Sequence, residues 1–554
     1  MKNFPIDMVI QEVSKKIAVI YKEKIKFKSF NFEDLYEIQL NFGQINFCKW
    51  ISESLFVICF KNNKENKLYL IDILNLKIED ILLFPNIIPK DMVSINEKYF
   101  LIFELRKQDA QRGYYLYDLS QKEILNIVDN IENSEFLYYG NKELIFREEK
   151  KSIIYKLGRD FDLRFEKQIN LDVLCIIKGL VISKLNCYTD QSFNVGYSLL
   201  SDYYNIHHIN NPKFHEITSI RFIEEINILL ITGVSFGEIK SICINISNNS
   251  WKEFEYIEGQ FVPYFLEGEK VLGIYSSITK YPTLEWKNYY VSGNKISVRA
   301  NSNLKIKKKK FKMNGIDIYY SDINEGYGDN KIFFYVHGGP HNNFQQSHSK
   351  LIMRLSELGY RVICIDYPGS TGYGDKYRGL NRFDWGGIDL QALIELRKAV
   401  VNKLTEVVIY GSSYGGYLSL LAAAKYPNLF NKVIAAASFN NIEHFYFESN
   451  PQVKRFLEYE LGEKLKDKHF LYDRSPYNYL NSLIKTDLLL IHGEEDEICN
   501  VSQSQNLFKK VQENLGNINL LVKNNLKHEE FSEDYWAEDI IEFISVEESS
   551  HRDK

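Results

Sequence analysis

Hydrophobic residues are arranged differently in the two halves of this chain. Residues 1–300 carry many short runs rich in Ile, Tyr, Phe and Val, interrupted by Asn, Lys, Glu and Gly, with almost no long amphipathic helical pattern. Short apolar runs bounded by such residues are typical of strands and turns. Further along, the runs 332–336 and 407–410 are typical of buried strands, and 417–425 is typical of a helix. The pattern predicts a β-rich region followed by an α/β region.

A weak repeat runs through the β-rich region. Strand-like aromatic and aliphatic runs recur at a spacing that is irregular but centres on roughly 40 residues, the period of a four-stranded propeller blade. Their number predicts a β-propeller of about seven blades, and the alternative is a generic β-rich domain with chance periodicity. The runs are Leu35-Tyr36, Leu68–Asp72, Tyr115–Asp118, Ile154-Tyr155, Asn205-Ile206, Ile242–Ile244 and Leu284–Trp286.

A lysine-rich run, Lys305–Lys310, marks the boundary between the two regions. Basic runs can bind nucleic acid, but the net charge of −5 favours a solvated interdomain strand or linker. A chain of 554 residues should hold more than one domain. We therefore expect a propeller over 1–304, an α/β-hydrolase domain over 305–546 that begins with a strand over 311–320, and a polar tail over 547–554.

Composition indicates a cytoplasmic protein without a cofactor. The N-terminal residues lack the continuous apolar core of a signal peptide, and no run approaches the ~18 apolar residues of a membrane helix. The seven cysteines are scattered singly, which favours reduced thiols. Cys499 is expected to be buried rather than reactive. Metal-ligand spacings and phosphate-binding loops are not found, so we expect no metal and no cofactor. The lack of a membrane-helix run and the net negative charge predict no membrane partner and no nucleic-acid partner.

The most specific local motif is Gly411-Ser412-Ser413-Tyr414-Gly415, which has the pattern G-x-S-x-G between the expected strand and helix. A serine on such a sharp turn has its hydroxyl exposed at the top of an α/β sheet. Its activation requires a histidine base and a carboxylate that orients the base.

Two histidines follow the serine at a suitable distance. His551 lies in the polar tail, whereas His528 follows the apolar run 518–522. His528 is therefore the expected base. The acid should end a strand between serine and histidine. The run 487–491 is followed by Glu494, Glu495 and Asp496. Asp496 is favoured, and the two glutamates are its rivals.

The segment His337–Pro340 follows another expected strand. Its two glycines allow a backbone N–H to approach a substrate carbonyl closely. An amide of this loop and the amide of Tyr414 would then form an oxyanion hole. His337 is expected to be structural.

Taken together, residues 305–545 resemble the catalytic domain of the prolyl oligopeptidase family, and most of all its acylaminoacyl-peptidase and dipeptidyl-peptidase-like branches. The resemblance implies a seven-bladed propeller, the triad Ser413, Asp496 and His528, and Gly339 as the second oxyanion donor. It also implies a serine peptidase for short peptides, with access restricted by the propeller. The matching segments are His337–Pro340, Gly369–Gly374, Trp385-Gly386 with Asp389, Gly411–Tyr417, Ser475-Pro476, and His492-Gly493 with Asp496.

Some positions depart from the family pattern. Pro368 replaces an arginine that usually precedes the Gly369–Gly374 segment, and Thr486 stands where a proline is frequent. The pair Glu224-Glu225 is a weak candidate for an anchor of substrate N-termini. The aromatic residues 445–447 (Phe445, Tyr446, Phe447) are expected either to line an apolar specificity pocket or to belong to the core.

Two other functional classes stay open. One is an esterase or acyltransferase that uses the same triad, and the other is a non-catalytic propeller scaffold. The intact triad argues against the scaffold. The sequence leaves open whether the protein forms a homo-oligomer.

Overall fold

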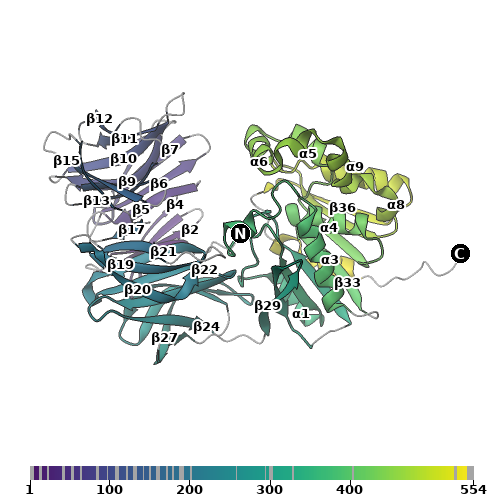
Figure 1. Cartoon of the computed structure of the whole chain (residues 1–554), viewed down its shortest axis with the longest axis horizontal. Coiled ribbons are helices and arrows are strands. Elements are labelled where there is room, and N and C mark those ends of the chain that lie inside the picture. The colour runs from purple at the N-terminus through teal and green to yellow at the C-terminus, as the bar shows by residue number, and fades with distance from the viewer. Residues whose placement is uncertain are drawn as a thin grey trace.

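The computed structural model comprises a strand-rich domain and an α/β domain that lie side by side (Figure 1). The structure describes residues 5–11, 15–21, 24–39, 44–50, 55–62, 65–75, 77–82, 87–95, 98–106, 112–119, 121, 123–128, 134–140, 143–148, 151–157, 163–169, 173–177, 180–185, 192–199, 202–256, 259–293, 295–298, 304–326, 330–401, 405–528 and 533–545. The polar tail expected at 547–554 lies outside the described residues.

The N-terminal domain is a β-propeller. In the part of the chain that the structure describes, its strands fall into seven groups of four consecutive antiparallel strands. The last two groups join through a parallel pairing of β24 with β28. This agrees with the expectation of about seven blades. The strands are β1 (Pro5–Gln11), β2 (Lys16–Tyr21), β3 (Lys24–Ser29), β4 (Asp34–Gln39), β5 (Gln44–Trp50), β6 (Leu55–Asn62), β7 (Glu65–Asp72), β8 (Lys77–Leu82), β9 (Ile87–Ile95), β10 (Lys98–Arg106), β11 (Arg112–Asp118), β12 (Glu123–Val128), β13 (Ser134–Gly140), β14 (Glu143–Glu148), β15 (Lys151–Leu157), β16 (Leu163–Ile169), β17 (Val173–Ile177), β18 (Leu180–Leu185), β19 (Phe193–Leu199), β20 (Asp202–Phe214), β21 (Glu216–Ile223), β22 (Ile228–Ser235), β23 (Glu238–Asn245), β24 (Ser250–Tyr256), β25 (Gln260–Glu267), β26 (Lys270–Ser277), β27 (Lys280–Ser292) and β28 (Lys295–Val298).

The C-terminal domain is built on an eight-stranded sheet in the order β29-β30-β32-β31-β33-β34-β35-β36. From β32 onward in this order, neighbouring strands run parallel. The strands are β29 (Ile306–Met313), β30 (Ile316–Ile323), β31 (Lys331–Val336), β32 (Arg361–Asp366), β33 (Glu406–Ser412), β34 (Lys432–Ala436), β35 (Asp487–Gly493) and β36 (Ile518–Lys523). The helices are α1 (Lys350–Glu357), α2 (Asp375–Arg378), α3 (Ile388–Val400), α4 (Tyr414–Lys425), α5 (Ile442–Glu448), α6 (Pro451–Leu461), α7 (Lys468–Asp473), α8 (Leu480–Leu483), α9 (Ser502–Glu513) and α10 (Ala537–Ser545).

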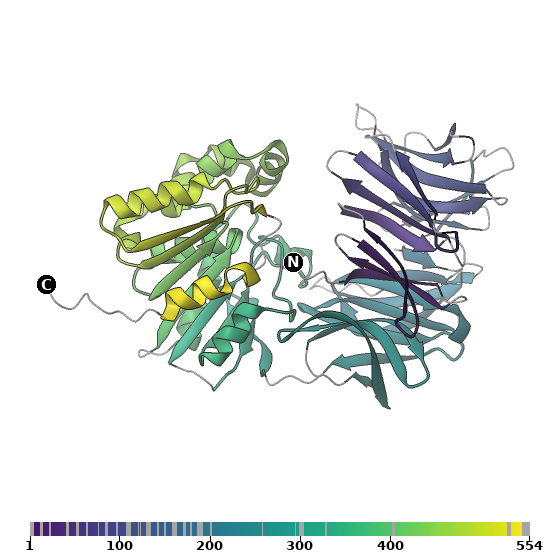
Figure 2. The same cartoon turned by 180° about the vertical axis from the view of Figure 1, so that it is seen from behind.

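The two faces of this sheet are covered by different helices. One core cluster contains Ile409 together with side chains of α3, α4 and α9, and the other contains Val408 together with side chains of α1 and α10. Figure 2 shows α10 and α1 from behind. Successive side chains of a strand point to opposite faces of the sheet. Strands that are apolar along their whole length are therefore buried on both faces of the sheet. The fold is therefore a propeller joined to a doubly wound α/β-hydrolase sheet, as expected.

The lysine-rich run belongs to the edge strand β29 and the residue before it. Lys308 pairs with the buried carboxylate of Asp366 at 2.5 Å, and Lys310 pairs with Asp317 at 2.8 Å. The single strand expected over 311–320 is wrong, because Asn314 and Gly315 adopt positive φ angles and turn the chain from β29 into β30. An Asn-Gly pair is a strong hairpin signal in a sequence.

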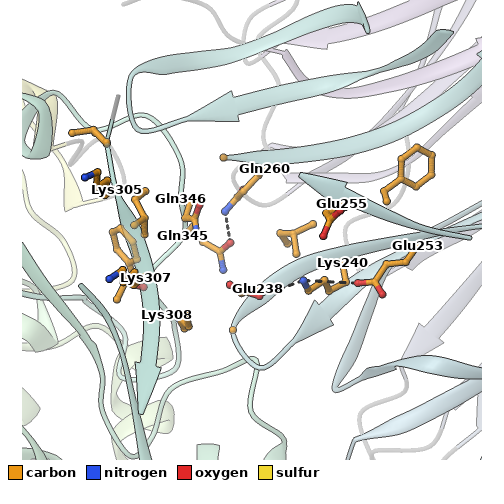
Figure 3. Close-up of a pocket in the computed structure, with 18 of the residues that line it drawn as sticks. Glu238, Lys240, Glu253, Glu255, Gln260, Lys305, Lys307, Lys308, Gln345 and Gln346 are labelled. Atoms are coloured by element: carbon orange, nitrogen blue, oxygen red, sulfur yellow. Dashed lines mark hydrogen bonds and ion pairs between the residues drawn. The ribbon is translucent and has the colours of Figure 1, made fainter. Parts of the chain in front are cut away.

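The propeller and the hydrolase domain meet through polar contacts around a cavity of about 560 Å³ (Figure 3). Nε2 of Gln260 donates a hydrogen bond to Oε1 of Gln345 at 2.5 Å. The N–H of Gly237 donates to the Gly372 carbonyl at 2.9 Å. The propeller lines this cavity with both signs of charge, and the β29 side lines it with ammonium groups. The charged residues are Glu238, Lys240, Glu253, Glu255 and Lys295 on the propeller side and Lys305, Lys307 and Lys308 on the other.

A second group of contacts joins the turn after β26 and the start of β27 to Ser349, which precedes α1, and to Asp534, which precedes α10. The N–H of Ser349 donates to the Ile278 carbonyl at 3.1 Å, and the Tyr281 hydroxyl donates to Asp534 Oδ2 at 3.1 Å. No helix among the described residues is both long and apolar enough to cross a membrane.

Candidate active site

Ser413 lies on a strained turn between β33 and α4. Its φ of 53° and ψ of −120° fall outside the regions that side-chain-bearing residues prefer. The turn is possible because its neighbours are glycines. A Cβ on Gly415 would lie 2.1 Å from the Val336 carbonyl oxygen, and a Cβ on Gly411 would lie 2.2 Å from the Gly415 carbonyl. The sequence thus forms the sharp strand-to-helix turn expected of G-x-S-x-G.

The structure brings Ser413, His528 and Asp496 together. Nε2 of His528 lies 3.2 Å from Oγ of Ser413, and Nδ1 lies 2.7 Å from Oδ2 of Asp496. Such a relay can activate a serine hydroxyl for attack. Glu494 and Glu495, the rivals for the acid, are exposed. His551 lies outside the described residues.

Asp496 is held as a carboxylate by its surroundings. Its Oδ1 accepts hydrogen bonds from the N–H groups of Ile498 at 2.9 Å and Cys499 at 2.8 Å. Burial alone would raise the pKa of Asp496, but the contacts of His492 and His528 lower it to about 2. The acid is therefore ionised at neutral pH and available to the histidine.

His492 is a site residue to which sequence reasoning gave no role. It is fully buried, and its Nε2 lies 2.8 Å from the Cys499 carbonyl and 3.4 Å from Asp496 Oδ2. Its position directly before Gly493, at the end of β35, was the available signal. Cys499 is 1% exposed, and burial raises the pKa of its thiol well above the usual value. Burial therefore disfavours the reactive thiolate form of Cys499 at neutral pH.

The glycine loop after β31 lies beside the serine. A Cβ placed on Gly338 would be 3.5 Å from Cβ of Ser413. Tyr414 is the first residue of α4, so its N–H has no acceptor within the helix. The side chain of His337 is held by a hydrogen bond between its Nε2 and Oγ of Ser370, which lie 2.8 Å apart. Its geometry is that of a structural residue.

The side chain of Tyr414 packs away from the reaction centre. Its hydroxyl donates to Asp389 Oδ2 at 2.5 Å, and Nδ2 of Asn381 lies 3.3 Å from the same oxygen. Burial raises the pKa of Asp389 to about 6. Asp389 therefore holds the Tyr414 hydroxyl in place and is not a member of the serine relay.

The aromatic residues Phe445, Tyr446 and Phe447 all lie on α5, but the structure does not gather them on one surface. Phe445 is 5% exposed and its ring stacks on Phe439 at a centroid distance of 4.3 Å. The Tyr446 hydroxyl donates to Glu458, and Phe447 is 66% exposed. Consecutive helical residues point about 100° apart, so three in a row cannot line one pocket. Phe445 belongs to the core, which was the alternative interpretation.

The weak anchor candidate Glu224-Glu225 forms an exposed 3-10 turn between β21 and β22 of the propeller. Among the described residues, no group of three or more His, Cys, Asp or Glu side chains is arranged to hold a metal ion.

Comparison with known proteins agrees with this geometry. Residues 346–547 match the sequence model of the prolyl oligopeptidase family. An uncharacterized peptidase of Bacillus subtilis is 28% identical over 190 residues, which are 33% of this chain and 28% of that protein. The mouse acylamino-acid-releasing enzyme is 30% identical over 176 residues, which are 29% of this chain and 23% of that enzyme. The alignments thus span about a quarter of the length of these curated relatives.

Solved structures resemble the chain over almost its whole length. A puromycin-hydrolyzing peptidase of Mycobacterium tuberculosis superposes with a TM-score of 0.67 at 13% identity, covering 95% of this chain and 91% of that one. The acylaminoacyl peptidase of Pyrococcus horikoshii gives 0.61 at 14% identity, covering 95% and 92%. These likenesses establish the propeller and hydrolase architecture. Residues 346–547 of this chain are thus similar in sequence to the prolyl oligopeptidase family.

Proposed function

We propose that this protein is a serine peptidase that hydrolyses short peptides through Ser413, His528 and Asp496. The observation that carries the proposal is the hydrogen-bonded relay, with 3.2 Å between Ser413 Oγ and His528 Nε2 and 2.7 Å between His528 Nδ1 and Asp496 Oδ2. The family match and the peptidases among the relatives favour a peptide bond as the target.

The mechanism follows from these contacts. Ser413 Oγ attacks the carbonyl carbon while Nε2 of His528 takes its proton, and the Gly339 and Tyr414 amides stabilise the oxyanion. His528 then donates this proton to the leaving amine, and the C–N bond breaks to give an acyl-enzyme. A water molecule attacks the ester, again losing a proton to His528. Collapse breaks the bond between the acyl carbon and Ser413 Oγ and releases the acid product, while His528 returns its proton to Ser413 Oγ.

Access to Ser413 is expected to depend on substrate size. The propeller contacts the hydrolase domain through Asn343 and Gln345, a few residues after the glycine loop. A peptide should be cleaved when it is short and should resist when it is part of a long chain. Among the described residues, Cys175, Cys243, Cys364 and Cys499 are free thiols, which supports a reducing compartment such as the cytoplasm.

The test begins with covalent labelling by a fluorophosphonate. Ser413→Ala should abolish labelling and lower peptide turnover by roughly 10⁶-fold, whereas the neighbouring Ser412→Ala should keep substantial activity. Labelling of Ser413→Ala would contradict the assignment. Mass spectrometry of a ten-residue peptide, its acetylated form and the same segment in a long unfolded protein then tests substrate class. Equal cleavage of short and long substrates would refute restricted access, and hydrolysis of simple esters alone would indicate an esterase.

A further inference from the structure

A buried carboxylate lies behind both halves of the proposed oxyanion hole. Glu460, the penultimate residue of α6, is 1% exposed. Its backbone carbonyl accepts a hydrogen bond from the N–H of Phe383 at 2.8 Å, which fixes the end of the helix against the neighbouring loop. The two oxygens of its carboxylate face different parts of the site.

One oxygen faces the glycine loop. Nε2 of His341 lies 3.0 Å from Oε1 of Glu460, and Nδ1 of His341 lies 2.8 Å from the Gly369 carbonyl. A carbonyl can only accept, so Nδ1 is a donor. Within the described residues, Oε1 receives no well-aligned hydrogen bond. Nε2 of His341 therefore faces a buried carboxylate oxygen, and the two side chains form a close pair.

His341 is close in the chain to the proposed oxyanion donor. A Cβ on Gly339 would lie only 2.5 Å from the His341 backbone nitrogen, so the two residues share one tight turn. A displacement of the His341 backbone would therefore disturb the position of Gly339.

The other oxygen faces the second donor. Nε1 of Trp385 donates to Oε2 of Glu460 at 3.4 Å. The Trp385 ring packs edge-on against Tyr414, with centroids 4.9 Å apart and an interplanar angle of 79°. Glu460 thus contacts the neighbours of both Gly339 and Tyr414 at once.

We propose that Glu460 is a positioning residue for the oxyanion hole, acting on Gly339 through His341 and on Tyr414 through Trp385. The proposal rests on the proposed function, since it assumes that these two amides stabilise an oxyanion. Neither the Glu460 carboxylate nor the His341 ring needs to touch the substrate. The pair holds both donors at a fixed separation, which matters most when the tetrahedral intermediate forms.

The test is Glu460→Gln, which keeps the shape and removes the charge. We expect kcat to fall roughly 10- to 100-fold while KM stays within about twofold, because only transition-state contacts weaken. Affinity for a peptide boronic acid, which forms a tetrahedral adduct, should fall in parallel. The matched control is Glu458→Gln on the same helix. Its exposed carboxylate accepts a hydrogen bond from Tyr446, and this variant should leave all values unchanged.

The rate of fluorophosphonate labelling separates this proposal from the proposed function. It should fall in Glu460→Gln even if the wild-type protein hydrolyses no peptide, because the probe reacts at the same serine through an oxyanion-like state. Unchanged labelling and kcat, or a rise in KM alone, would overturn the positioning role.

A double-mutant cycle tests the path through His341. His341→Gln should reproduce the loss of kcat, and the double variant should be no worse than either single one if the two residues act as a pair. Fully additive losses would refute the coupling. If Glu460→Gln does not fold, His341→Gln alone decides, by the same split between kcat and KM.

Discussion

Replacing Asp496 by asparagine changes the proposed relay at a single atom. The side-chain oxygen of asparagine can still accept the hydrogen bonds from Ile498 and Cys499. Its amide nitrogen, however, replaces the oxygen that faces Nδ1 of His528 at 2.7 Å. Two N–H groups would then oppose each other, so the His528 ring must carry its proton on Nε2 instead. In that tautomer Nε2 donates to Ser413 and cannot take its proton.

Two magnitudes follow from this change. Loss of the correct tautomer should lower kcat by roughly 10⁴-fold, which corresponds to about 5 kcal/mol in the activation barrier. The pKa of Asp496 is about 2 instead of the ordinary 3.8. The ionised side chain therefore stabilises the folded state by about 2 kcal/mol at pH 7. Because the folded-state pKa is lowered, this stabilisation is present above pH ~4 and is lost as the pH falls toward 2.

The assay combines steady-state kinetics with denaturant unfolding followed by tryptophan fluorescence, comparing wild-type and Asp496→Asn protein at pH 7 and pH 3. The stability deficit of the variant should be about 2 kcal/mol at pH 7 and about half of that at pH 3. Two results would refute the reasoning. One is a kcat within tenfold of wild type, which would mean that His528 does not depend on Asp496 for its tautomer. The other is a deficit of equal size at both pH values.

Three further predictions concern stability and packing. Burial raises the pKa of Asp389 to about 6, so between about pH 4 and 6 the folded state holds a proton that the unfolded chain releases. The free energy of unfolding should therefore fall as the pH rises through this range. Asp389→Asn should flatten this pH dependence when denaturation is measured at pH 4.5 and 7. Gly415→Ala would place a Cβ 2.1 Å from the Val336 carbonyl, so kinetics and thermal melting should show both activity and stability sharply reduced, and near-normal values would contradict the turn geometry. Tyr281→Phe removes the interdomain hydrogen bond to Asp534 and should cost about 1 kcal/mol in urea unfolding; an unchanged free energy of unfolding would contradict a role for this contact.

Local patterns in the sequence predicted the elements and the three residues of the relay. Ser413, Asp496 and His528 each follow an apolar strand, and parallel strands end at the same edge of a sheet, so their order along the chain was enough to bring them together. The propeller was predictable because its repeat is local, with each blade formed by four consecutive strands. The β29–β30 hairpin carried an Asn-Gly signal, although a single strand was expected there.

The tertiary structure decided which polar residues surround the relay. Glu460 lies 119 to 121 positions from His341 and Gly339 in the chain, and its pairing with His341 arises only because α6 packs beside the glycine loop. The choice among Glu494, Glu495 and Asp496 likewise depended on which side chain points into the site after β35. A sequence records the side chains and the periodicity of each element, but burial, ion pairing and pKa depend on neighbours that only packing brings within a few ångströms.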